Sequence, residues 1–337
     1  MLNYSIFFFI WEEVMENLLE NLNKEQVEAV KTTKGPLLIL AGAGSGKTKV
    51  LTTRIAYMIQ NGVRPRNILA VTFTNKAAKE MKERIGKIIG EDTVKYMWVG
   101  TFHGICGRIL RENIDKYNSI VISKLLIKNA IPYNAIITLT IKLFKEQIGI
   151  LEFYRNYYTS ILVDEFQDTN LLSYWLLNFL ITDKTNILLL GDSLQRIYGF
   201  IGAVPNLLSH AQNTFNLQLI SLEKNYRFAS NENMLQLDKI IRQNAITPFD
   251  NPNSLKSKVE FNIYDNQEEE ALQVVIKSQK ILQNDSFAKV AILAKQRGPN
   301  IEHIIKTFNH NKIPFFYGLF TDEDSEYITF NRKCLYE

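Results

Sequence analysis

Residues 41–48 carry the most specific chemical signal in the sequence, because they read Ala-Gly-Ala-Gly-Ser-Gly-Lys-Thr. Glycines let a backbone wrap closely around phosphate oxygens, since they have no Cβ and tolerate positive φ. In such a loop the lysine binds the β- and γ-phosphates of a nucleotide, and the next hydroxyl binds Mg²⁺. Ala41 stands where the strict pattern has glycine. The loop still predicts a site for ATP and Mg²⁺, formed by Gly42, Ala43, Gly44, Ser45, Gly46, Lys47 and Thr48.

A second signal is an apolar run that ends in two acidic residues, at residues 161–165. A strand that ends in this way places carboxylates beside a phosphate loop. Asp164 is predicted to hold Mg²⁺ through water, and Glu165 to orient and deprotonate the attacking water. The alternative is a strand whose acidic end has no chemical role, and the loop upstream argues against it.

Elements of two kinds must position these residues. Apolar runs predict buried strands at residues 37–40, 68–73, 94–99, 161–163, 187–190 and 217–222. Helical spacing of apolar residues predicts helices between them, such as residues 50–59 and 75–89. Alternation of strands and helices indicates an α/β fold with a parallel sheet.

Composition sets limits on function. The 337 residues include 39 Lys and Arg against 35 Asp and Glu, so the net charge of +4 permits a nucleic-acid partner without requiring one. Two cysteines and four histidines form neither a disulfide framework nor a zinc spacing. The apolar stretch at residues 6–11 is too short to span a bilayer. We therefore expect no membrane association and, since no targeting signal is recognised, a location in the cytoplasm or wherever the genome is replicated.

The order of motifs resembles that of the UvrD/Rep/PcrA group of superfamily 1 DNA helicases, from residue 22 to residue 228. The matching segments are residues 22–26 (Q motif), 72–78 (Ia), 100–104 (Ib), 164–170 (II), 191–200 (III) and 225–227 (IV).

The resemblance implies roles for further residues of the nucleotide site. Gln26 is expected to read the adenine edge, and Tyr226 to stack on adenine. Gln195 is expected to sense the γ-phosphate. Arg227 is expected to stabilise transition-state charge as an arginine finger; the alternative is an ordinary surface ion pair.

The resemblance also implies a track for single-stranded DNA. Phe73 and Phe200 are expected to stack on bases, which tolerates any sequence. Thr101 and His103 are expected to contact backbone phosphates. For both phenylalanines the alternative is core packing. Four lysines form a basic face on the predicted helix at residues 75–89: Lys76, Lys79, Lys82 and Lys87. This face either contacts DNA or is simply solvated.

The implied fold is a RecA-like P-loop NTPase sheet with a short helical insertion and a partial second RecA-like domain. The expected organisation is an N-terminal extension (1–15), a first RecA-like domain in two parts (16–110 and 159–248) around the insertion (111–158), and the incomplete second domain (249–337). In that last part, strands are expected at residues 259–263, 290–293 and 313–317, and helices at 268–282 and 301–308.

Three departures from the family pattern bear on activity. Ile201 stands where motif III normally has arginine, the insertion is shorter than the family's accessory domain, and nothing after Phe320 resembles motifs V and VI. We expect nucleotide binding with weak turnover, or a second polypeptide that supplies the missing motifs. Three functions stay open: an ATP-dependent DNA helicase of 3′-to-5′ polarity, an ATP-responsive single-stranded-DNA-binding module, and a regulatory fragment that pairs with a full-length helicase.

Overall fold

The computed structural model describes residues 18–116, 131–133, 135–199, 202–244, 262–285, 290–294 and 298–315. The chain divides into two compact units, residues 1–246 and 247–337. Phe200, Ile201, the expected extension at residues 1–15, and most of the expected strand at 259–263 lie outside the described residues.

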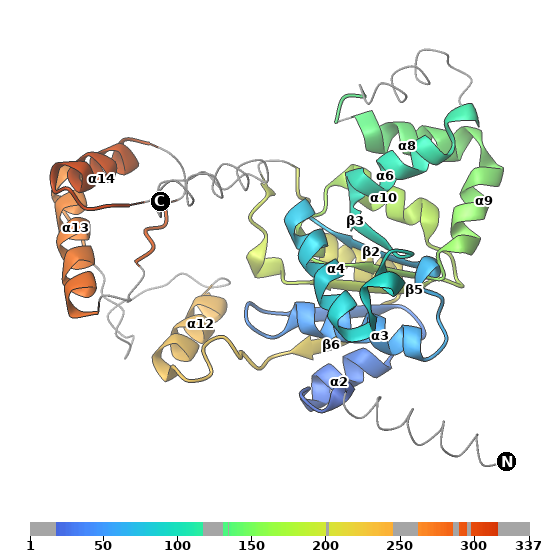
Figure 1. Ribbon diagram of the computed structural model, residues 1–337, viewed down its shortest axis with the longest axis horizontal. Helices are drawn as coiled ribbons and strands as arrows, with labels where there is room; N and C mark the ends of the chain where they lie inside the picture. Colours follow the sequence, from blue (N-terminus) through green and yellow to red (C-terminus); the bar gives the residue numbers. More distant parts are fainter. Residues whose placement is uncertain are drawn as a thin grey trace. The chain divides into compact units, whose positions relative to one another are not determined.

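The first unit is built on a six-stranded sheet of order β3-β2-β4-β5-β1-β6 in which every neighbouring pair is parallel (Figure 1). Its strands are β1 (Leu37–Ala41), β2 (Ile68–Thr72), β3 (Trp98–Thr101), β4 (Ser160–Val163), β5 (Asn186–Gly191) and β6 (Gln218–Leu222). In a parallel sheet all strands end at the same edge, so the loops after β1, β4, β5 and β6 meet there. The predicted α/β fold with a parallel sheet is confirmed.

Helices cover both faces of this sheet, which explains why its strands consist mainly of buried apolar residues. One face packs against α2 (Lys24–Lys31), α3 (Lys47–Gln60), α4 (Asn75–Ile89) and α5 (Glu91–Val94). The other face packs against α6 (Phe102–Glu112), α8 (Ala135–Glu146), α9 (Ile148–Tyr157), α10 (Leu171–Leu180) and α11 (Leu207–Thr214). Short 3₁₀ helices occur at Pro65–Asn67, Ile114–Lys116, Phe166–Asp168 and Ser193–Gln195, and α12 (Glu232–Asn244) follows β6.

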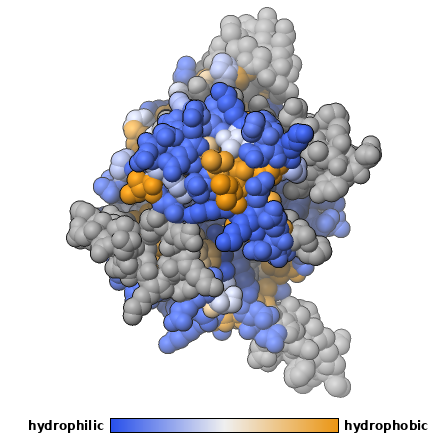
Figure 2. Space-filling view, turned by 90° about the vertical axis from the view of Figure 1, so that its left-hand side faces the viewer, coloured by the Kyte–Doolittle hydropathy of each residue, from blue (hydrophilic) through white to orange (hydrophobic). Residues whose placement is uncertain are grey.

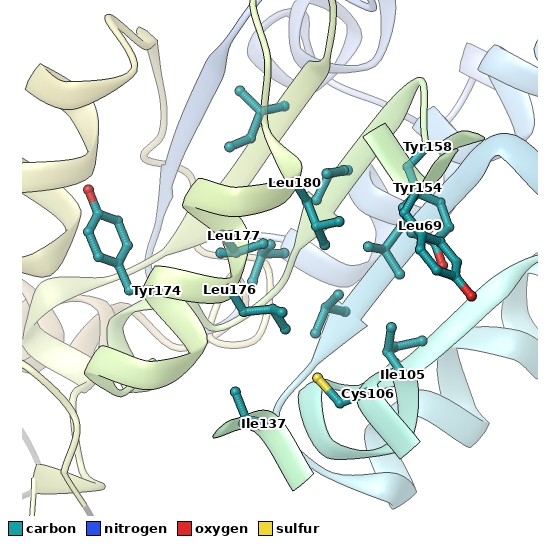
Figure 3. Close-up of a cluster of buried hydrophobic side chains, with 14 of the residues drawn as sticks. Leu69, Ile105, Cys106, Ile137, Tyr154, Tyr158, Tyr174, Leu176, Leu177 and Leu180 are labelled. Atoms are coloured by element: carbon teal, nitrogen blue, oxygen red, sulfur yellow. The ribbon is translucent and has the colours of Figure 1, made fainter. Parts of the chain in front are cut away.

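The described part of the helical insertion belongs to the main core of this unit. Leu143 and Phe144 of α8 and Tyr154 of α9 are fully buried in the same cluster as strand residues. Figure 3 shows labelled side chains of this cluster: Leu69, Ile105, Cys106, Ile137, Tyr154, Tyr158, Tyr174, Leu176, Leu177 and Leu180. The insertion helices α8 and α9 therefore complete one face of the sheet.

One predicted strand of the first unit is wrong in part. Residues 94–99 were expected to be extended, but Val94 ends the short helix α5 and β3 begins only at Trp98. Gly90 ends α4 with φ +88°, and acidic residues in the first turn favour a new helix at that point. Val94 and Met97 are both buried, at the three-residue spacing of a helical turn.

The second unit consists, in its described part, of α13 (Gln267–Asn284) and α14 (Pro299–His310), which confirms the two predicted helices. Ala271 and Val275 of α13 and Phe308 of α14 are buried. The predicted strand at 290–293 is wrong: these residues are described without strand pairing, and Leu293 is 93% exposed. Residues 313–315 likewise form no strand.

Apolar side chains are scattered over the described surface. Figure 2 shows one face that is largely hydrophilic, with apolar residues in small groups. Within the described residues, no helix combines the length and the apolar character that crossing a membrane requires.

Candidate nucleotide-binding site

The phosphate loop lies between β1 and α3, as predicted from the sequence. Ser45 closes the turn, because its amide and its hydroxyl both donate to the carbonyl oxygen of Gly42, at 3.2 Å and 2.7 Å. Gly44 and Gly46 have φ of +78° and +88°, a region that favours glycine. Helix α3 begins at Lys47 without any side-chain cap. Its first amides are thus free to bind an anion.

Lys47, at the start of α3 after β1, contacts residues that follow β4 and β5. Its side chain is buried, and Nζ donates to Glu165 Oε2 at 2.9 Å and to Gln195 Oε1 at 3.5 Å. Glu165 follows β4 and Gln195 follows β5, so residues predicted separately from three motifs converge. Thr48, which follows Lys47 in α3, is half-buried.

The acidic pair at the end of β4 differs in environment between its two members. Asp164 is only 8% exposed, and burial, reinforced by the charge of Glu165, raises its pKa to about 6 despite the opposing charge of Lys47. Glu165 adopts a left-handed backbone with φ +48°, which is strained for a residue other than glycine. Its amide donates to Asp164 Oδ1 at 3.0 Å. Backbone strain of this kind is common at functional sites. In this conformation the Glu165 side chain reaches Lys47 Nζ.

A hydrogen-bonded chain continues from Glu165 to the loop after β5. Gln167 Nε2 donates to Glu165 Oε2 at 2.7 Å, and Gln167 Oε1 accepts from the amide of Asp192 at 3.0 Å. Asp192 Oδ2 in turn accepts from Gln195 Nε2 at 2.7 Å. Gln167 and Asp192 fall within the segments that match motifs II and III, but the sequence predicted no role for either. The available signal was their position, since Asp192 directly follows β5 and Gln167 lies in the short 3₁₀ helix after β4.

The loop after β6 is fastened to the phosphate loop. The amide of Tyr226 donates to the carbonyl oxygen of Gly44 at 2.8 Å. A Cβ at Gly44 would lie 2.5 Å from Asn225 Oδ1 and 2.6 Å from Arg227 Cβ, so only glycine allows this approach. Tyr226 is 42% exposed, and Lys224 Nζ lies 5.0 Å from its ring centroid. The structure thus brings the predicted Tyr226 and Arg227 to the phosphate loop.

Gln26 also reaches the loop, through the start of α2. It forms a capping box with Asn23, in which the amide of each residue donates to the other side chain. Its Nε2 atom donates to the carbonyl oxygen of Ser45 at 2.9 Å. The side chain is 2% exposed. Its described contacts are structural, and its role in reading adenine stays a prediction.

A cavity of about 520 Å³ opens beside the loop and is a suitable size for a small ligand. Its lining includes Gly42, Ala43, Ser45, Asp192, Asn225 and Arg242. Asn225 Nδ2 is buried without a hydrogen-bond partner among the described residues. Such an orphaned donor beside free helix amides fits an anionic ligand with acceptor oxygens.

The donor set also fits a magnesium ion that arrives with phosphates. Mg²⁺ prefers oxygen ligands and is usually held by one or two carboxylates or hydroxyls plus substrate phosphates. Thr48 and Asp164 supply such oxygens. Within the described ranges, no group of three or more His, Cys, Asp and Glu side chains is arranged to hold a metal by itself.

Three of the residues predicted to contact DNA lie at the ends of β2 and β3: Phe73 follows β2, Thr101 ends β3, and His103 lies in the first turn of α6. The fourth, Phe200, lies outside the described residues. Phe73 stacks on Tyr198, with ring centroids 4.4 Å apart at 27°. Thr101 caps α6 by accepting from the amide of Gly104 at 3.1 Å. His103 stacks on Tyr133 at 3.8 Å, and burial lowers its pKa. Each of these side chains has a described structural contact, so their DNA roles stay predictions.

A groove of about 760 Å³ runs along the edge strand β3, between α4 and α6. The four lysines of the predicted basic face are exposed, and two of them, Lys79 and Lys82, line this groove. Arg108 and Arg111 of α6 line it from the opposite side. Arg108 also packs over the ring of Trp98, 3.7 Å from its centroid. The sequence did not predict a role for either arginine, because no local pattern shows that α6 borders the same edge strand as α4.

The parallel sheet, the phosphate loop before α3 and the acidic end of β4 together define a P-loop nucleotide-binding protein of the α/β class. The family model described as the UvrD/REP helicase N-terminal domain matches residues 22–127 and 119–216, more than half of the chain. The chain belongs to the UvrD/REP helicase family, and the resemblance found in its motifs is confirmed.

Curated relatives agree with this assignment. The ATP-dependent DNA helicase PcrA of Staphylococcus aureus (strain Mu50 / ATCC 700699) is 38% identical over 284 residues, covering 63% of this chain and 39% of the relative. PcrA of Staphylococcus epidermidis (strain ATCC 12228 / FDA PCI 1200) is 37% identical over 303 residues, covering 68% and 41%. The chain thus spans about two fifths of the length of these relatives. Among solved structures, the Pif1 helicase from Candida albicans overlaps with a TM-score of 0.42 at 13% identity, over 76% of this chain and 55% of that chain.

Proposed function

We propose that this chain binds ATP with Mg²⁺ and carries the nucleotide half of an ATP-dependent DNA helicase, in which hydrolysis drives movement along single-stranded DNA in the 3′-to-5′ direction. The observation that carries the proposal is that Lys47, Glu165 and Gln195, from segments that follow three different strands, meet at the phosphate loop. The names of the curated relatives support the same function.

The proposed chemistry starts with an exchange of partners. Lys47 leaves Glu165 and binds the β- and γ-phosphates, which supply more acceptor oxygens than a carboxylate. Glu165 is then free to orient and deprotonate the attacking water, as a general base at the strand end. Gln195, already beside Lys47, senses the γ-phosphate. Arg227 stabilises the charge that develops on the transferred group.

Metal and base contacts complete the proposed site. Thr48 and the carboxylate of Asp164 would hold Mg²⁺, which when bound neutralises phosphate charge. The exposed ring of Tyr226 is placed to stack on adenine. Gln26, which donates a hydrogen bond to the carbonyl oxygen of Ser45, would link base recognition to the conformation of the loop.

The proposed DNA track uses aromatic faces and positive charge. Phe73 and Tyr198 form an aromatic pair at the sheet edge where the strands end, and a base stacks on such rings irrespective of sequence. Lys79, Lys82 and the arginines of α6 offer charge for the backbone. Single-stranded DNA is therefore the proposed partner.

Calorimetry with Mg²⁺-ATP tests the nucleotide site. Lys47→Ala should remove most binding, whereas Lys34→Ala, in an exposed turn, should bind as the wild type does. A phosphate-release assay with and without single-stranded DNA then tests the coupling to DNA. Unchanged ATP affinity in Lys47→Ala would refute the site, and hydrolysis indifferent to DNA would refute the coupling.

A further inference from the structure

Arg242, near the end of α12, is a cation for which neither the sequence motifs nor the proposed function has a role. Its Nη1 atom donates to Asp192 Oδ2 at 2.8 Å. Its Nε atom lies 3.2 Å from both carboxylate oxygens of Asp238, one helical turn earlier. The side chain is 30% exposed. One guanidinium is therefore shared by two carboxylates at the border of the nucleotide cavity.

The guanidinium lies directly against the phosphate loop. A Cβ at Gly42 would be 2.7 Å from Arg242 Nη2 and 3.0 Å from its Cζ. Arg242 lines the same cavity as Gly42, Ala43 and Ser45. The missing side chain at Gly42 thus leaves room for a planar cation at the place where the loop turns from β1 toward α3.

The contact with Asp192 places Arg242 at the γ-phosphate end of the proposed site. Asp192 Oδ2 is shared, because it accepts both from Arg242 Nη1 and from Gln195 Nε2. Gln195 is the residue expected to sense the γ-phosphate, and its other amide atom lies 3.5 Å from Lys47 Nζ. Arg242 and the expected sensor Gln195 therefore share one carboxylate oxygen of Asp192, and three successive contacts link Arg242 to the phosphate-binding Lys47.

We propose that Arg242 binds the terminal phosphate of a nucleoside triphosphate in this cavity, exchanging Asp192 for phosphate oxygens. The inference rests on the proposed nucleotide site. A guanidinium binds a phosphate through two parallel hydrogen bonds, which suits a group that already lies against the phosphate loop. A diphosphate lacks the terminal group, so Arg242 distinguishes the two nucleotides. Because Arg242 is part of α12, the exchange also ties the position of that helix to the nucleotide that is bound.

The alternative is that Arg242 only fastens α12 to the loop after β5. The two roles predict different results for Asp238→Asn. If Arg242 binds phosphate, Asp238 competes for it, and its neutralisation strengthens triphosphate binding. If Arg242 only holds α12 against the loop after β5, loss of the Asp238 contact loosens α12. Binding of both nucleotides is then weakened or unchanged.

The experiment is a calorimetric titration of wild type, Arg242→Ala, Asp238→Asn and Arg84→Ala with Mg²⁺, a non-hydrolysable ATP analogue and ADP. Arg84 is the matched control, because it forms an exposed ion pair with Glu80 at the same four-residue spacing as Arg242 and Asp238. We expect Arg242→Ala to lose about tenfold or more in affinity for the analogue, the range of a charge-assisted contact. ADP affinity stays the same, and Asp238→Asn binds the analogue more tightly.

Three results would overturn the inference. Equal losses for analogue and ADP in Arg242→Ala would make the residue a structural fastener. No loss in Arg242→Ala would remove it from the site. If wild type binds neither nucleotide, the nucleotide site itself is refuted and the inference falls with it, a result distinct from the first two. Thermal unfolding of each variant identifies a folding defect, and Asp238→Asn decides between the two roles even where Arg242→Ala is unstable.

Discussion

Lys47 Nζ and Glu165 Oε2 are joined at 2.9 Å, so the residue proposed to bind phosphate and the residue proposed to activate water neutralise each other. The lysine side chain is 9% exposed and the glutamate side chain 36%. A buried cation needs a counter-charge, and Glu165 supplies it when no phosphate does. In the proposed mechanism, nucleotide binding breaks this pair and frees Glu165 to act as the base when ATP arrives. The proposal thereby links chemistry at Glu165 to occupancy of the phosphate loop.

Glu165→Gln should retain nucleotide binding and lose hydrolysis. The amide can still accept from Lys47 but cannot take a proton, and loss of a general base costs about 10²–10⁴-fold in rate. Calorimetry with Mg²⁺-ATP and a phosphate-release assay measure the two effects separately. Glu80→Gln, on the exposed face of α4, is the control. If Glu165→Gln hydrolyses ATP at the wild-type rate, another group is the base.

Asp164→Asn should stabilise the metal-free protein, and more so at high pH. Burial raises the pKa of Asp164 from 3.8 to about 6, so the folded state holds a proton that the unfolded chain has released. The cost of the buried charge is fully present above pH 6 and vanishes below about pH 4. At pH 8 the gain should be on the order of 3 kcal/mol in free energy of unfolding.

Urea unfolding in EDTA at pH 8, 6 and 4 measures this difference. Asp183→Asn, in an exposed turn, is the control. The gain from Asp164→Asn should shrink steadily as the pH falls. A gain that is equal at all three pH values would show that the buried charge of Asp164 does not limit stability.

Phe73→Ala should weaken binding of single-stranded DNA by about tenfold or more, because each base stacked on an aromatic side chain contributes about 1–3 kcal/mol. The change leaves Tyr198 without its stacked partner. Fluorescence anisotropy at one fixed salt concentration measures it, since phosphate contacts vary with salt. Phe153→Ala is the matched control, because Phe153 stacks on Tyr157 in another stacked pair, on α9. Equal DNA binding by both variants and wild type would make Phe73 a packing residue.

Much of the first unit could be predicted from the sequence because most residues of its strands are buried. Five of the six strands coincide with predicted apolar runs to within a residue or two, and α4 has the predicted bounds. The phosphate loop and the acidic end of β4 could be predicted because each is a contiguous segment of the sequence. Their meeting in space then follows from the parallel sheet, which brings all strand ends to one edge.

What could not be predicted depends on contacts between distant segments. Arg242 meets Asp192 across 50 residues, and no local pattern shows how α12 docks. The end of α5 at Val94 was not predicted because the buried Val94, Met97, Trp98 and Val99 also read as one apolar run ending in a strand. In the second unit, the apolar run at residues 290–293 has a composition that a buried strand could have. A strand also needs a neighbouring strand to pair with, and the run itself does not specify one.

Gly44→Ala should reduce nucleotide affinity by more than its cost in stability explains. Gly44 has φ +78°, and the new Cβ would lie 2.5 Å from Asn225 Oδ1 and 2.6 Å from Arg227 Cβ, pushing the loop after β6 off the phosphate loop. Gly35→Ala is the matched control, because Gly35 has φ +85° with nothing within 4 Å. Both variants carry the backbone strain of about 1–2 kcal/mol, so thermal unfolding should show both destabilised. Only Gly44→Ala also meets this steric conflict, and calorimetry with Mg²⁺-ATP should show it binding about tenfold more weakly than Gly35→Ala. Equal affinities in the two variants would mean that the Asn225–Arg227 loop contributes nothing to nucleotide binding.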